Sequence, residues 1–167
     1  VANHTHLYQD GLALPNVTIT LDIFDDDGTW NTVDSLNILV HNVPPTAGNF
    51  FSFDAVVSEG GTTTVFFVGP FTDPGSPDSP FHYAFDFNGN GIYGEAGEVG
   101  NGTYAGSGVA SSAVVPASFL ADDDDSPRTV NARIIDNDGG FSEYSVLIGI
   151  TNVAPVVNAG ADATAFS

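Results

Sequence analysis

The sequence predicts an all-β fold in which one complete two-sheet sandwich is flanked by parts of two others. Apolar and polar residues alternate with a period of two, and turns rich in Gly, Pro and Asp separate these runs. A motif of acidic turn, alternating run and linker also occurs twice. Its turns begin at Asp25 and Asp136, and its linkers begin at Asn42 and Asn152. We therefore expect tandem repeats of about 111 residues, since a fixed period is typical of repeat architectures.

The complete unit, residues 44–154, contains seven runs with strand character. In chain order we expect strands at 50–57, 62–68, 80–87, 102–106, 111–119, 128–135 and 141–151. In the run 62–68, Phe66 and Phe67 must face opposite sides, so one of them should be exposed or lie under a neighbour. In the run 80–87, every second residue is aromatic, which predicts the bulky centre of one sheet. Seven short strands in about 110 residues fit an immunoglobulin-like β-sandwich.

The two ends of the chain correspond to incomplete units. Residues 1–43 match the C-terminal half of a sandwich, because Ile19, Leu21 and Ile23 stand where the complete unit has Val130, Ala132 and Ile134. Residues 155–167 match the start of the next repeat. The sequence begins with neither a methionine nor a signal-like segment, which suggests a mature or excerpted segment. A half-sandwich exposes its inner face and unpaired edges. Either the continuing chain or a neighbouring chain, by strand addition, would have to complete it.

The composition limits the classes of partner. The chain has 167 residues, of which 21 are acidic and two are basic, and its net charge at pH 7 is −19. This charge opposes nucleic-acid binding, which needs basic side chains to neutralise phosphates. Only 14% of residues are charged and 42% are hydrophobic, so we expect a folded chain without a membrane span. The acidity fits either solubility, including life in salt, or binding of divalent cations at acidic loops.

Five short motifs, taken in order, resemble a known family. They are His6-Leu7-Tyr8, Asp73-Pro74-Gly75, Tyr83-Ala84-Phe85-Asp86-Phe87, Asp136-Asn137-Asp138-Gly139 and Asn152-Val153-Ala154-Pro155. Together they resemble PKD (polycystic kidney disease-type) domains, which are immunoglobulin-like repeats of bacterial cell-surface and secreted proteins. The chain departs from the family where Phe85 replaces its usual Trp and Asn88-Gly89-Asn90-Gly91 replaces its Gly-Asp-Gly turn. The resemblance implies a sandwich without catalytic activity that serves as a spacer, adhesion module or structural repeat.

The segment that begins at Asp86 is the best candidate for a calcium loop. Oxygen-bearing side chains at alternate positions followed by a glycine reproduce the first half of a calcium loop. The candidate ligands are Asp86, Asn88, Asn90, the carbonyl of Ile92, Glu95 and Glu98. Glu95 and Glu98 flank the position of the usual closing glutamate, which is Gly97 here. Two of the three leading ligands are neutral asparagines, so affinity should be low to moderate. The alternative is a polar, glycine-rich turn that ends a strand.

Acidic loops at both ends of the sandwich suggest further calcium at the junctions between units. In immunoglobulin order, Asp73, Asp78, Asp136 and Asp138 gather at one end, and Asp122 and Asp124 gather at the other with the loop after Asp86. Stacked units would bring the two acidic ends together, where a cation could bridge them. The alternative is that these turns are simply solvated.

We therefore expect a non-enzymatic structural repeat protein, extracellular or at the cell surface, that builds a fibre, filament or stalk. Its partners would be copies of itself or adjacent repeats, through strand complementation or end-to-end stacking. No nucleophile, phosphate-binding loop or acid–base pair is recognisable, and the four histidines fit structural or exposed positions. The alternative is an adhesion or carbohydrate-binding accessory module of a larger secreted protein. It predicts an exposed aromatic platform, for which Trp30, Tyr93 and Tyr104 are candidates.

Overall fold

The computed structural model describes residues 5–6, 8, 16–74, 79–121, 126–157 and 160, and these residues form an all-β fold. One short 3-10 helix, η1 (Ala117–Phe119), follows the seventh strand. The strands are β1 (Asn16–Phe24), β2 (Thr29–Leu39), β3 (Asn49–Ser52), β4 (Val56–Ser58), β5 (Thr63–Val68), β6 (His82–Asp86), β7 (Ser112–Val115), β8 (Arg128–Ile135) and β9 (Phe141–Thr151). The all-β prediction is confirmed.

Strands β3 to β9 form the two sheets of a β-sandwich. One sheet has the order β3-β5-β7, and the other has the order β4-β9-β8-β6. Aromatic side chains fill the space between them: the ring of Phe67 lies 4.8 Å from that of Phe50 and 5.3 Å from that of Tyr83. Phe85 and Phe87 are fully buried, as the alternation along residues 80–87 predicts. Phe67 faces this core, whereas Phe66 packs on Phe51 on the outer side of its sheet.

The predicted strands differ from the observed ones in three places. The run 50–57 is divided between β3 and β4, which belong to different sheets, and β4 pairs in parallel with the end of β9. The run 111–119 ends as a strand at Val115 and continues into η1. Residues 102–106 form turns, because the side chain of Asn101 accepts hydrogen bonds from both the backbone N–H and the hydroxyl of Thr103.

The long segment between β6 and β7 covers the free edge of β6. The backbone N–H of Tyr83 donates to Gly108 O at 2.7 Å, and that of Phe85 donates to Val99 O at 2.7 Å. These bonds occupy donors that an edge strand would otherwise leave open to another chain. The alternating pattern therefore predicts β6 correctly as a strand, although an irregular loop pairs with one of its edges.

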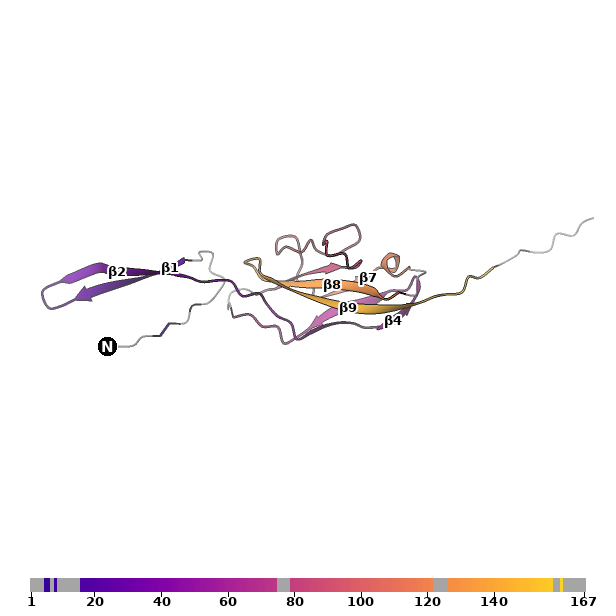
Figure 1. Cartoon of the computed structure of the whole chain (residues 1–167), viewed down its shortest axis with the longest axis horizontal. Coiled ribbons are helices and arrows are strands. Elements are labelled where there is room, and N and C mark those ends of the chain that lie inside the picture. Colours follow the sequence, from indigo (N-terminus) through magenta and orange to yellow (C-terminus); the bar gives the residue numbers. More distant parts are fainter. Residues whose placement is uncertain are drawn as a thin grey trace, which may run out of the picture.

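Strands β1 and β2 form a separate two-stranded hairpin that extends away from the sandwich along the long axis of the molecule (Figure 1). Ile19 pairs with Leu36 and Val17 with Ile38, in an antiparallel register. This face is apolar, yet 42% of Ile19 and 61% of Leu36 are exposed. An amphipathic sheet normally packs its apolar face on a core, so the hairpin has the sequence of a buried element in an exposed position.

Candidate functional site

Asp86 is fully buried at the end of β6 and organises the loop that follows it. One carboxylate oxygen accepts from Gly89 N at 2.7 Å, and the other accepts from Gly91 N at 2.8 Å and from the side-chain amide of Asn131 at 3.1 Å. The loop can fold this tightly because Gly89 and Gly91 adopt φ values of 70° and 84°, which L side chains rarely adopt. Three N–H donors thus compensate the buried charge.

The other candidate calcium ligands after Asp86 satisfy one another. The side-chain amides of Asn88 and Asn90 both donate to Glu95 Oε2, at 2.8 and 2.7 Å. Glu98 accepts from the backbone N–H of Glu95, and its partial burial raises the pKa of its carboxyl group. Ile92 N donates to the side chain of Asn90, and the buried Glu98 Oε1 has no hydrogen-bond partner among the described residues. The predicted residues therefore converge on one loop that is closed by its own hydrogen bonds.

Asp136 is the second fully buried aspartate, and its environment repeats that of Asp86. Asp136 Oδ1 accepts from Asp138 N at 2.9 Å and from Gly140 N at 2.8 Å. Asp136 Oδ2 accepts from the side-chain amide of Asn42 at 3.0 Å. Because Asn42 belongs to the linker after β2, this contact joins the linker to the turn between β8 and β9. Sequence reasoning placed Asp136 in a metal site and missed this joint.

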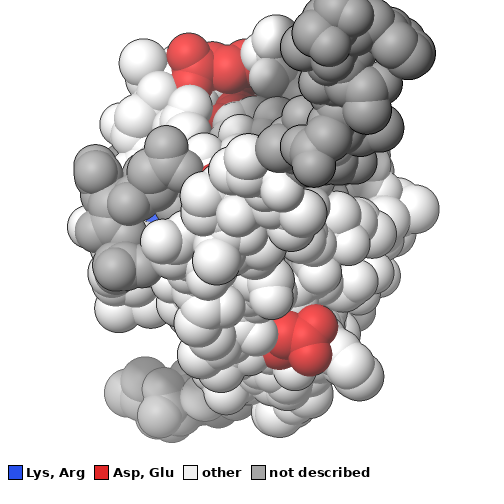
Figure 2. All heavy atoms as spheres, turned by 90° about the vertical axis from the view of Figure 1, so that its right-hand side faces the viewer, with Lys and Arg blue, Asp and Glu red and all other residues white. Residues whose placement is uncertain are grey.

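The remaining junction candidates are only partly described. Asp138 is exposed in the turn between β8 and β9, and Asp73 lies beside a pocket, whereas Asp78, Asp122 and Asp124 lie outside the described residues. The pairing of His82 with Ile135 places the loop before β6 at the same end as the β8–β9 turn. Figure 2 views the opposite end, where acidic side chains form separate groups on a mainly uncharged surface. No three His, Cys, Asp or Glu side chains of the described residues lie together as a metal site would require.

Arg133 fixes the loop between β6 and β7 on the outer face of the larger sheet. Its guanidinium lies 4.4 Å from the ring centre of Tyr93 and 4.0 Å from that of Phe141, and its Nε donates to Glu143 at 2.8 Å. Burial, and then the Glu143 carboxylate, raise the pKa of Tyr93, whereas the charge of Arg133 opposes this rise. Sequence reasoning missed this cluster, although only two basic residues occur in the chain.

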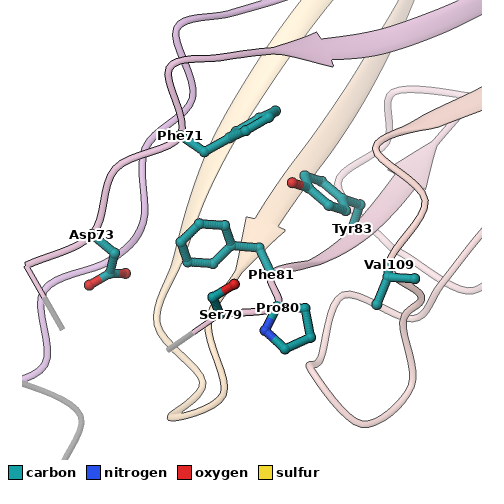
Figure 3. A pocket seen from close by; sticks show the side chains of 7 residues that line it. All are labelled: Phe71, Asp73, Ser79, Pro80, Phe81, Tyr83 and Val109. Carbon is teal, nitrogen blue, oxygen red and sulfur yellow. The ribbon is translucent and has the colours of Figure 1, made fainter. Parts of the chain in front are cut away.

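An open pocket of about 510 Å³ lies beside the start of β6. Aromatic and aliphatic side chains form part of its walls, and Asp73 and Ser79 also line it (Figure 3). The other lining residues are Phe71, Pro80, Phe81, Tyr83 and Val109. The aromatic residues that the sequence suggested for a platform lie elsewhere. Tyr93 packs under Arg133, Tyr104 stacks on His82 with ring centres 3.8 Å apart, and Trp30 is exposed on the hairpin.

No protein-family model matches the chain, and no curated protein is significantly similar to it in sequence. Within the part of the chain that the structure describes, no helix has the length and apolarity needed to cross a membrane. The geometry therefore offers three features for a functional interpretation: the Asn42–Asp136 joint, the exposed hairpin and the aromatic pocket.

Proposed function

We propose that this chain is a segment of a non-enzymatic structural repeat protein, extracellular or at the cell surface, that builds a fibre, filament or stalk from PKD-like, immunoglobulin-type sandwiches. The observation that carries the proposal is the correspondence between two hairpins. The pair Ile19 and Leu36 in β1–β2 corresponds to the pair Val130 and Val146 in β8–β9, one repeat period further along the chain. As far as Leu21, after which its register shifts, the exposed hairpin thus pairs in the register of the last two strands of the sandwich.

The joint between hairpin and sandwich supports a mechanical role. Asn42 contacts the buried carboxylate of Asp136, and Pro45, three residues later, is also buried. Proline fixes its own φ and restricts the residue before it, so the adjacent Pro44 and Pro45 reduce the freedom of the linker. A linker that is both stiff and anchored transmits force along the long axis of the molecule and resists bending. These are the properties that a stalk or fibre requires.

The two buried aspartates also fit a structural protein better than an enzyme. Asp86 and Asp136 each accept three hydrogen bonds from N–H donors, and both carboxylate oxygens of each are engaged. A catalytic base needs an oxygen that can reach the proton of a substrate. In this chain the buried carboxylates instead hold a loop and a turn in place.

Labelling of intact cells of the source organism tests the proposal. Antibodies raised against the purified chain are expected to label the surface of unbroken cells or material shed from them, and electron microscopy is expected to show label along fibres or stalks. Label that appears only after the cells are broken would contradict the proposed location. Label on isolated globular particles would contradict the structural role.

The aromatic pocket favours a second candidate, an adhesion or carbohydrate-binding module. Sugar rings stack on aromatic faces, and Phe71 and Phe81 line the pocket with Asp73 beside them as a hydrogen-bond acceptor for hydroxyl groups. A glycan array is expected to give hits that Phe81→Ala abolishes. Phe53→Ala, which changes an aromatic ring that is 78% exposed outside this pocket, serves as the control. An array without hits argues against this candidate.

A further inference from the structure

The Asn42–Asp136 joint has two halves, and the chain contains a second copy of each half. Asn152 follows β9 in Asn-Val-Ala-Pro, as Asn42 follows β2 in Asn-Val-Pro-Pro. Asp25 begins the turn between β1 and β2, as Asp136 begins the turn between β8 and β9. The second asparagine therefore stands at the end of the sandwich, and the second aspartate stands at the tip of the hairpin.

The turn at Asp25 already has most of the geometry of the turn at Asp136. Asp25 Oδ1 accepts from the backbone N–H groups of Asp27 and Gly28, both at 3.0 Å. Its own N–H donates to Gly28 O at 3.0 Å, as that of Asp136 donates to Gly140 O at 3.0 Å. The difference lies in the surroundings, since Asp136 is fully buried whereas Asp25 is exposed. Asp25 thus has the prepared acceptor without the linker that covers Asp136.

Exposed apolar side chains lie near both Asp25 on the hairpin and Asn152 after β9. On the hairpin, 53% of Leu21 is exposed, whereas Ala132 at the corresponding position is fully buried. After Asn152, Val156 is 96% exposed and Val157 is 86% exposed. In the Asn42–Asp136 joint, the segment that corresponds to residues 152–157 packs on the sandwich. Pro45 is buried, and Ala47 N donates to the Tyr144 hydroxyl at 2.8 Å.

The two free halves lie at opposite ends of the molecule. The hairpin extends from one end along the long axis, and the chain after β9 leaves at the other end (Figure 1). A single copy cannot bring Asn152 to its own Asp25 in this arrangement. Two copies placed head to tail can do so, and the contact can then repeat, because a heterologous interface of this kind does not close on itself.

We propose that residues 152–157 of one copy dock on the β1–β2 hairpin of a second copy, with the Asn152 amide donating to the free carboxylate oxygen of Asp25. This inference rests on the proposed structural function and adds a contact by which copies of this segment can join. The Asn42–Asp136 joint is its template, with the same residue types, the same order and the same direction along the chain. The contact also covers apolar side chains that are exposed at both ends.

Sedimentation of the full chain over a range of concentrations, at about 0.15 M salt to screen the negative charge, tests this contact. The wild type is expected to form a concentration-dependent series of linear oligomers. Asn152→Asp places a carboxylate against Asp25 and is expected to weaken association at least about tenfold, equivalent to roughly 1.4 kcal/mol. Combining Asn152→Asp with Asp25→Asn exchanges the two groups, restores a donor–acceptor pair and is expected to recover association.

Two controls keep the interpretation specific. Leu147→Asp adds the same charge at a residue that is 60% exposed on the sandwich, and it is expected to leave association unchanged. Circular dichroism of each variant shows that the fold is retained. A wild type that stays monomeric up to about 1 mM overturns the inference, as does an Asn152→Asp variant that associates normally or is not rescued. Surface labelling in either case would leave the proposed function intact.

Discussion

Replacement of Asp136 by alanine should destabilise the sandwich far more than the same change at Asp25. Asp136 accepts three hydrogen bonds, from Asp138 N, Gly140 N and the Asn42 amide, at 2.8–3.0 Å. A hydrogen bond to a charged group contributes about 1.5–3 kcal/mol. The simple sum is too large, because Asp138 is exposed and water can replace part of what is lost there, and because the variant no longer buries a charge. We expect a loss of about 3–5 kcal/mol.

Calorimetry and urea unfolding followed by far-ultraviolet circular dichroism measure this loss. In a unit of about 110 residues, each kcal/mol lowers the melting temperature by roughly 4 °C, so the transition of the Asp136→Ala variant should fall by about 12–20 °C. Tryptophan fluorescence is the wrong probe, because the single tryptophan, Trp30, lies in the hairpin. It provides a separate signal for that part of the molecule.

Asp25→Ala is the matched control. Asp25 makes the equivalent pair of backbone contacts but is exposed, so water can take the place of its carboxylate and the expected loss is below about 1 kcal/mol. Asn42→Ala, which removes one donor from Asp136, should fall between the two. A loss of less than about 1 kcal/mol for Asp136→Ala, or equal losses for both aspartates, would refute the argument from burial.

Three further predictions concern the loop after β6. Arg133→Gln should lower the free energy of unfolding by about 1–3 kcal/mol. Arg133→Lys should lower it less, because lysine keeps the charge although it loses the planar stacking on Tyr93 and Phe141. Urea unfolding measures both losses. Glu98→Gln should raise the melting temperature at pH 7 but not near pH 3. The raised pKa of Glu98 means that its contribution to stability is greatest below the unfolded-state value, about 4.3, and declines as pH rises through the folded-state value. Millimolar calcium should raise the melting temperature relative to chelator, and Glu95→Gln, which removes an exposed carboxylate of the loop, should reduce this rise; identical melting curves would remove calcium from the interpretation.

The alternation of residue types predicted a strand most reliably where each of its two faces has a constant environment along its length. The alternation of Tyr83, Phe85 and Phe87 identified β6, at the edge of the larger sheet, and those of β8 and β9 identified the two central strands of that sheet. It failed at residues 102–106, because a short run with a tyrosine has strand propensity, whereas the contacts of Asn101 with Thr103 favour a turn. It also merged β3 and β4 into one predicted strand, because a residue period of two does not show where the chain passes from one sheet to the other.

The candidate site was predicted by residue type but not by role. Sequence spacing brought Asp86, Asn88, Asn90 and Glu95 into one loop, and the structure places them there. It could not reveal that Asp86 is fully buried among N–H donors, because one of those donors, Asn131, lies on β8. The same limit hid the contact between Asn42 and Asp136, which lie far apart in the chain.

The sequence by itself determined the all-β character, the main strands and the correspondence between two distant stretches of the chain, because these depend on residue period and spacing alone. The tertiary structure decided which of two equivalent aspartates is buried. Asp25 and Asp136 have similar local turn chemistry, but Asp136 also accepts a hydrogen bond from Asn42 of the linker. Burial is a property of what packs on a residue, and neighbours that are distant in the chain supply it.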